Sequence, residues 1–197
     1  MKLKPFQADE ASKSDFETLC AAFSVDGQYI AFGIVNNQIR LQNIETGNLK
    51  ASFVLDEGWK GVKILSFSPD GKYIVAGAEW KHQIQLWNIE TGDKVFSKPI
   101  TLQDYIKCVG FSPDGKYIVS GQGDFTIQLW NAKTGAVASK PFQGHIHTEV
   151  FRASLSPNGK YIATGSVDGT IQLWEIETPS QADEVAPRSL MSKSHTG

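Results

Sequence analysis

One eight-residue stretch occurs twice in this chain without a single change. The sequence FSPDGKYI stands at Phe67–Ile74 and again at Phe111–Ile118, 44 positions further on. Two related stretches keep the same register, FSVDGQYI at 23–30 and LSPNGKYI at 155–162. A fixed period of this length is typical of solenoids and propellers, in which each unit packs mainly against its neighbours. The chain is therefore predicted to consist of four copies of one structural unit.

Each unit contains the pattern of several short strands. KYIVSG at 116–121 alternates in character, so that Tyr117 and Val119 face one way while Ile118 and Ser120 face the other. A segment rich in β-branched and aromatic residues follows, TIQLWN at 126–131, with counterparts in the other three units. An apolar segment precedes each SPDG turn, and a less regular stretch follows each Thr-Gly pair. No helical periodicity of useful length competes, so the predicted class is all-β with four strands per unit.

Four short antiparallel strands in about 44 residues are the pattern of a β-propeller blade. We expect one propeller domain over residues 1–178, with repeats of roughly 1–47, 48–92, 93–135 and 136–178. Residues 179–197 have no strand pattern and are predicted to be a disordered tail. Because KPFQ at 4–7 recurs at 140–143, residues 2–7 are expected to supply the outer strand that the last blade lacks.

The chain resembles the WD-repeat family over about residues 20–178. The resemblance rests on FSPDGKYI, on GSVDGTIQLWE at 165–175 and on the Gly-His pair at 144–145. The Trp-Asp dipeptide itself is absent, because Trp87, Trp130 and Trp174 are followed by Asn or Glu. The resemblance implies a buried tetrad of His, Ser or Thr, Asp and Trp in each blade.

Only the fourth repeat contains all four tetrad residues. They are His145, Thr164, Asp168 and Trp174. The third repeat keeps Ser120, Asp124 and Trp130 without the histidine. Their expected role is structural.

The way in which four blades close is left open by the pattern. They can form half of an eight-bladed ring that a second chain completes, a small four-bladed ring, or part of a larger propeller. An isolated half-ring would leave strand edges uncovered. We therefore favour the homodimer.

Composition and motifs exclude several classes of function. A formal charge of −2 gives no excess of basic residues of the kind that binds nucleic acid. No apolar run is long enough to cross a membrane. No secretory signal is recognisable. The two cysteines, Cys20 and Cys108, stand at equivalent repeat positions, as expected for packing residues. Both observations suit a cytoplasmic protein. Phosphate loops, nucleophile elbows and zinc helices are absent, so no cofactor is expected. His145, His147 and Glu149 form the one weak metal-like pattern, and no metal is predicted there.

The predicted binding surface lies on the end of the propeller that carries its variable loops. In the second and third repeats these loops hold five aromatic or imidazole side chains: Trp59, Trp80, His82, Tyr105 and Phe125. Clustered aromatic residues in loops are typical of interaction hot spots. The leading interpretation is a non-enzymatic scaffold for a protein or peptide partner. The alternatives are a structural module whose partner is its own copy and, ranked last, an enzyme built on the propeller.

Overall fold

The computed structural model describes residues 18–34, 37–56, 61–78, 81–124, 126–143, 150–156, 160–166, 169–175 and 189–193. Within these residues the chain forms four antiparallel sheets of four strands each. The first sheet contains β1 (Thr18–Phe23), β2 (Tyr29–Ile34), β3 (Gln38–Asn43) and β4 (Leu49–Val54), and the second contains β5 (Ile64–Phe67), β6 (Tyr73–Ala78), β7 (Gln83–Asn88) and β8 (Ile100–Thr101). The third contains β9 (Ile106–Phe111), β10 (Tyr117–Gln122), β11 (Thr126–Asn131) and β12 (Phe142–Gln143), and the fourth contains β13 (Val150–Leu155), β14 (Tyr161–Ser166), β15 (Ile171–Glu175) and β16 (Ser189–Lys193).

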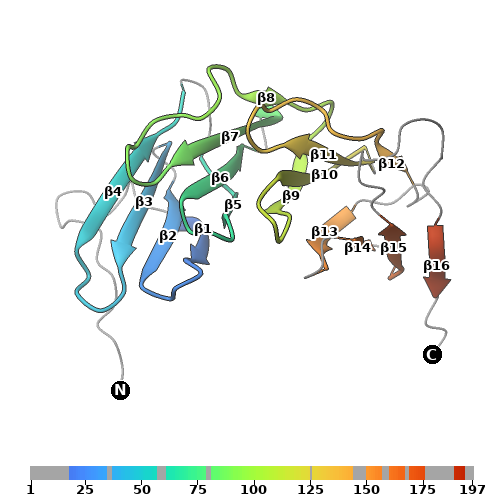
Figure 1. The fold of residues 1–197 in the computed structure, drawn as a ribbon, viewed down its shortest axis with the longest axis horizontal. Coiled ribbons are helices and arrows are strands. Elements are labelled where there is room, and N and C mark those ends of the chain that lie inside the picture. The colour runs from blue at the N-terminus through green and yellow to red at the C-terminus, as the bar shows by residue number, and fades with distance from the viewer. Residues whose placement is uncertain are drawn as a thin grey trace.

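The four sheets fan out around their innermost strands and form an open arc (Figure 1). Neighbouring sheets contact one another through β1 and β5, β5 and β9, and β9 and β13. The first and fourth sheets lie at opposite ends of the arc. The all-β class and the four four-stranded blades are thus confirmed. No described segment is a helix long and apolar enough to cross a membrane.

Repeats and sheets are offset by one strand. The predicted repeat 48–92 begins with β4, which is the outer strand of the first sheet, and then supplies β5, β6 and β7 to the second. The same offset recurs at β8 and β12. Each repeat therefore ties two neighbouring sheets together covalently, which fixes the order of the blades around the arc.

The third strand of the second sheet packs on both of its faces. In β7, Ile84 and Leu86 join the core cluster shared with the third sheet, whereas Trp87 joins the cluster shared with the first. These side chains are 0–2% exposed. Because successive residues of a strand point to opposite faces, the short run QIQLW supplies core to two interfaces at once.

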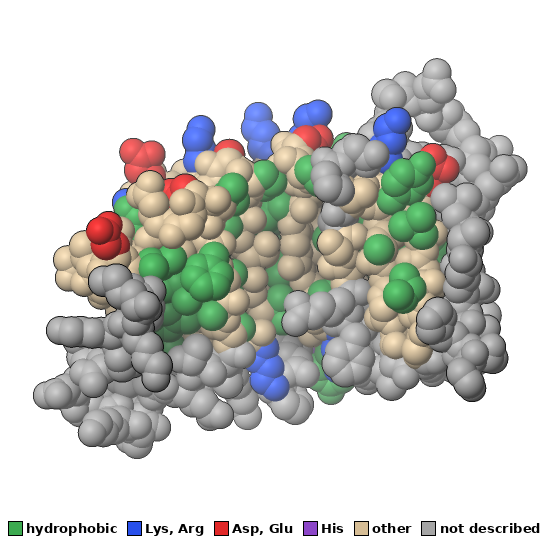
Figure 2. Space-filling view, turned by 90° about the horizontal axis from the view of Figure 1, so that it is seen from below, with side chains coloured by type: hydrophobic (Ala, Val, Ile, Leu, Met, Phe, Trp, Pro, Cys, Tyr) green, Lys and Arg blue, Asp and Glu red, His purple; other side chains and the backbone are tan. Residues whose placement is uncertain are grey.

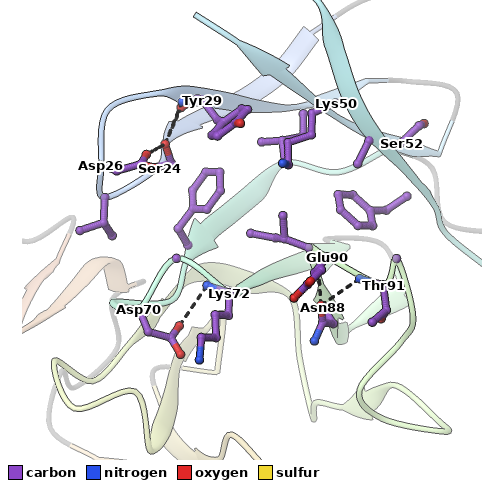
Figure 3. A pocket seen from close by; sticks show the side chains of 18 of the residues that line it. Ser24, Asp26, Tyr29, Lys50, Ser52, Asp70, Lys72, Asn88, Glu90 and Thr91 are labelled. Atoms are coloured by element: carbon purple, nitrogen blue, oxygen red, sulfur yellow. Dashed lines mark hydrogen bonds between the residues drawn. The ribbon is translucent and has the colours of Figure 1, made fainter.

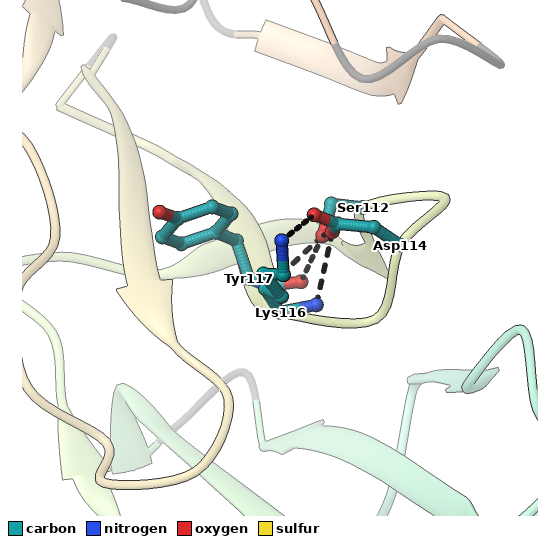
Figure 4. A network of polar contacts seen from close by, with 4 residues as sticks. All are labelled: Ser112, Asp114, Lys116 and Tyr117. Carbon is teal, nitrogen blue, oxygen red and sulfur yellow. Dashed lines mark hydrogen bonds and ion pairs between the residues drawn. The ribbon is translucent and has the colours of Figure 1, made fainter. Parts of the chain in front are cut away.

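The SPDG turns are held by a repeated polar network (Figure 4). The Ser112 hydroxyl donates to Asp114 Oδ1 at 2.6 Å and accepts from the backbone N–H of Tyr117 at 2.9 Å. Gly115 takes a positive φ of 69°, which glycine adopts without a steric penalty. Serine makes the same pair of bonds in the first and second sheets, at Ser24 and Ser68.

The turn carboxylates are stabilised in their ionised form. Partial burial alone would raise the pKa of Asp114, but hydrogen bonds from Ser112 and the Lys116 backbone, with the Lys116 charge, hold that pKa below its ordinary value of 3.8. A lowered pKa contributes stability that is present above the unfolded-state value and is lost as the pH falls through the folded-state value.

The cysteines are packing residues, as their repeat register predicts. Both are free of disulfides, and Cys108 is buried. Cys20 Sγ donates to the carbonyl of Val62 at 3.1 Å, and burial raises the pKa of Cys20 to about 11. The Cys20 thiol therefore stays protonated near neutral pH.

The fourth sheet corrects one prediction about the tail. Residues 189–193, expected to be disordered, form β16 and pair antiparallel with β15, with Ile171 opposite Lys193. The outer position of this sheet is therefore filled from the C-terminal side, and the N-terminal strand expected at residues 2–7 lies outside the described residues. An unpaired strand edge offers backbone donors and acceptors to any extended segment within reach, even one without a strand pattern.

Replacing Ser112 with Ala should lower the free energy of unfolding by about 1–3 kcal/mol, because the N–H of Tyr117 loses its buried acceptor. Urea denaturation measures this, with the exposed Ser97→Ala as the matched control. Part of the deficit should disappear as the pH falls from 3.8 through the lower folded-state pKa of Asp114, because a protonated carboxyl accepts a weaker hydrogen bond from Ser112. Equal midpoints for both variants at pH 7 would contradict this role.

Candidate functional site

Two of the five predicted binding residues lie within the described part of the chain, and they are in contact. His82 lies in the turn between β6 and β7, and Tyr105 directly precedes β9. Their rings meet edge to face, with centroids 4.6 Å apart and planes at 70°. Tyr105 is 41% exposed. Trp59, Trp80 and Phe125 lie outside the described residues.

Backbone bonds hold the loops of this pair in place. The carbonyl of His82 accepts from the N–H of Leu102 at 2.7 Å, and the carbonyl of Tyr105 accepts from Gly123 at 2.8 Å. A Cβ at Gly123 would lie 3.4 Å from the carboxylate of Asp104, so the loops approach closely. We call the surface formed by His82 and Tyr105 the loop face. The first of these bonds lies within the second sheet and the second within the third, and the contact between the two rings joins the sheets at the loop face.

Of the predicted tetrad in the fourth sheet, the described residues include the hydrogen bond between Thr164 and Trp174. Trp174 Nε1 donates to Thr164 Oγ1 at 3.0 Å, and both residues are 1% exposed. His145 and Asp168 lie outside the described residues. In the third sheet Trp130 makes the equivalent bond to Ser120 at 2.9 Å. These bonds lie within the core, which fits the structural role predicted for them.

The third repeat uses its aspartate for its own turn. Asp124 Oδ1 accepts from the hydroxyl of Thr126 at 2.6 Å and from the Thr126 backbone N–H at 3.0 Å. In the structure, this aspartate thus orders the turn from β10 to β11, which borders the loop face. The sequence pattern alone assigned it to an incomplete tetrad.

A cleft that the sequence did not predict opens on the side of the blades that carries the SPDG and Thr-Gly turns (Figure 3). It lies between the first and second sheets and has a volume of about 880 Å³. Tyr29 and Lys50 line it from the first sheet, with the Lys50 ammonium 4.9 Å from the Tyr29 ring centroid. Lys72, Asn88 and Glu90 lie on the opposite wall. The cleft therefore mixes both charges with aromatic surface.

The cleft exists because the side chains beside the Thr-Gly turn of the second sheet are smaller than those beside the equivalent turn of the third sheet. Between the second and third sheets, buried Phe96 fills the space beside the Thr-Gly turn, where a Cβ on Gly135 would lie 3.3 Å from the Phe96 ring. At the equivalent Gly92 nothing lies within 4 Å, and the lining there includes Ala51 and Ser52. The signal that could have revealed the cleft was Ala51, which stands four residues after the first Thr-Gly pair where Phe96 stands after the second.

Metal-binding side chains do not gather in the described residues, where no group of three or more His, Cys, Asp or Glu is placed to hold an ion. The weak pattern of His145, His147 and Glu149 lies outside them.

Three stretches of the chain match the model of a known protein family. Residues 49–88, 96–131 and 137–175 match the family model described as "WD domain, G-beta repeat", and together they make up more than half of the chain. The chain belongs to the WD-repeat family. Each matched stretch begins in or just before the outer strand of one sheet and ends with the third strand of the next, in agreement with the one-strand offset. WD repeats imply a protein–protein interaction scaffold, and such domains are generally non-enzymatic.

Several curated proteins share part of this sequence. Apoptotic protease-activating factor 1 of Homo sapiens is 35% identical over 82 residues, covering 38% of this chain and 6% of that protein. The Mus musculus protein of the same name is 28% identical over 120 residues, 60% of this chain and 9% of that protein. WD repeat-containing protein 26 homolog of Drosophila melanogaster is 34% identical over 90 residues, 44% of this chain and 14% of that protein. The chain thus spans a small part of each relative.

Replacing Thr164 with Val should cost about 1–3 kcal/mol of unfolding free energy, because the shape is kept while buried Trp174 Nε1 loses its acceptor. Thermal and urea unfolding measure the loss. Thr101→Val, at an exposed position of β8, is the control and should be nearly neutral. Equal stability of the two variants would mean that the Thr–Trp bond contributes nothing to the fold.

Proposed function

We propose that this chain is a non-enzymatic cytoplasmic scaffold that binds a protein or peptide at the loop face. The observation that carries the proposal is the edge-to-face contact of His82 with Tyr105, which joins the loops of two blades and leaves Tyr105 41% exposed. Large side chains that are ordered yet accessible make effective binding anchors, because little conformational entropy is lost when a partner covers them.

The chemistry of the loop face favours a peptide-like partner. Tyr105 offers an apolar ring with a hydroxyl, and His82 offers an imidazole that can donate or accept a hydrogen bond. Exposed Lys81 and half-buried Asp104 lie beside the pair and provide charges of both signs. An extended peptide with an apolar side chain and flanking polar groups would match this surface.

A peptide display library selected on the purified chain tests the proposal without a known partner. Replacing Tyr105 with Ala should weaken the selected peptides by about 30-fold, the loss typical of an interface anchor, and His82→Ala should weaken them less. Titration calorimetry measures the affinities. Val137→Ala, which shortens a 61% exposed side chain next to a Thr-Gly turn, is the control and should leave binding unchanged.

The same peptides decide between the loop face and the cleft. Lys50→Glu reverses a charge in the cleft and should not affect peptides bound at the loop face. Loss of binding in Lys50→Glu with full binding in Tyr105→Ala would move the binding site to the cleft and overturn the proposal.

The second candidate function is self-assembly. It is favoured by a separate observation, the exposure of core positions at both ends of the arc.

A further inference from the structure

The open side of the arc carries two separate apolar surfaces. Figure 2 looks onto this side, and hydrophobic side chains gather over the first sheet at the left and over the fourth sheet at the right. Neither surface belongs to the loop face or to the cleft between the first two sheets. Each is the outward side of a terminal blade.

The fourth sheet exposes positions that are core elsewhere. Ile171 of β15 is 65% exposed, whereas its counterparts Ile39, Ile84 and Ile127 are each 0% exposed. Leu173 is 37% exposed, whereas its counterparts Leu41, Leu86 and Leu129 are 0–2% exposed. In the first three sheets these positions pack against the following blade. We call the surface around Ile171 and Leu173 the trailing face.

The first sheet exposes the complementary set. Phe23 of β1 is 66% exposed, whereas its counterpart Phe67 is 8% exposed and packs against the preceding blade. Ala21 lies on the same side of β1 and is also exposed, and β1 pairs with β2 so that Phe23 and Ala21 stand opposite Ile30 and Phe32. At the outer strand Val54 is 62% exposed. We call the surface around Phe23 and Phe32 the leading face.

We propose that a second copy of this chain covers both faces, its leading face packing on this chain's trailing face and its trailing face on this chain's leading face. Inside the chain, every trailing face meets a leading face, and that contact is made three times with the same residue positions. The second copy continues this interface with a surface of the same kind. Pairing of two copies through these faces does not depend on the loop face or on the function proposed for the loop face.

Two copies are sufficient to cover every exposed face. Each chain has one leading and one trailing face, so a twofold pair makes two equivalent contacts and leaves neither of these faces open for further growth. The open side of one arc is where the other arc lies, and the product is a closed ring of eight blades. The unlike character of the two faces means that each contact is heterologous, although the pair as a whole has twofold symmetry.

The solution mass is the direct test. Light scattering on a size-exclusion column should give twice the 21.6 kDa of one chain. Phe23→Lys and Ile171→Glu should each weaken the pair by about 100-fold or more, because each places a charge in both contacts of the homodimer. Val137→Glu adds a charge at a 61% exposed position away from both faces and should leave the mass unchanged.

Mixing the two variants tests the unlike pairing. A heterodimer of the Phe23→Lys and Ile171→Glu chains keeps one contact free of substitutions, so the equimolar mixture should regain dimer that neither variant forms alone. Like-with-like pairing predicts instead that one variant stays dimeric and that mixing restores nothing. Circular dichroism and cooperative unfolding show whether each variant is folded, and Phe23→Leu and Ile171→Val are milder replacements if the charges prevent folding.

Three outcomes would overturn the proposal. They are a folded wild-type chain that stays monomeric up to about 100 μM, assembly into open-ended species, and a dimer that neither variant weakens.

Discussion

The rest of the structure depends on the packing of one blade against the next through the two faces of a short strand. In β3, β7 and β11 an isoleucine and a leucine face the following blade. The tryptophan near the end of β7, and that near the end of β11, faces the preceding blade. No blade buries its own two faces, so stability comes from neighbours, as in other repeat proteins. The terminal blades are the exception, because among the described residues each has a face with no neighbouring blade.

Turn chemistry makes this packing specific. The serine, aspartate and glycine of each SPDG turn set the angle at which the second strand leaves the first, through bonds that recur at Ser24, Ser68 and Ser112. Because these turns fix one side of every blade, variation is confined to the opposite side and to the outer strands. That is why His82 and Tyr105 can be held in contact from different blades while their loops differ in sequence from the other copies.

Functionally, the arc offers surfaces of three kinds. The loop face presents an ordered aromatic pair, the cleft arises from a local shortage of side-chain volume beside Gly92, and the end faces are unpaired copies of an internal interface. A scaffold can use all three at once because they are separate in space. Membership of the WD-repeat family agrees with this division, in which repetition builds the frame and departures from repetition provide recognition.

The sequence by itself determined the class, the number of blades and the side on which His82 and Tyr105 lie, because the 44-residue period and strand alternation are local properties written in the chain. Only the tertiary structure decided the rest. The pairing of residues 189–193 with β15 depends on an unfilled edge, the cleft depends on volumes contributed by two blades, and the exposure of Phe23 and Ile171 depends on where the arc ends. Each of these is a relation between segments distant in sequence, and no periodic pattern encodes the presence or absence of a neighbour in space.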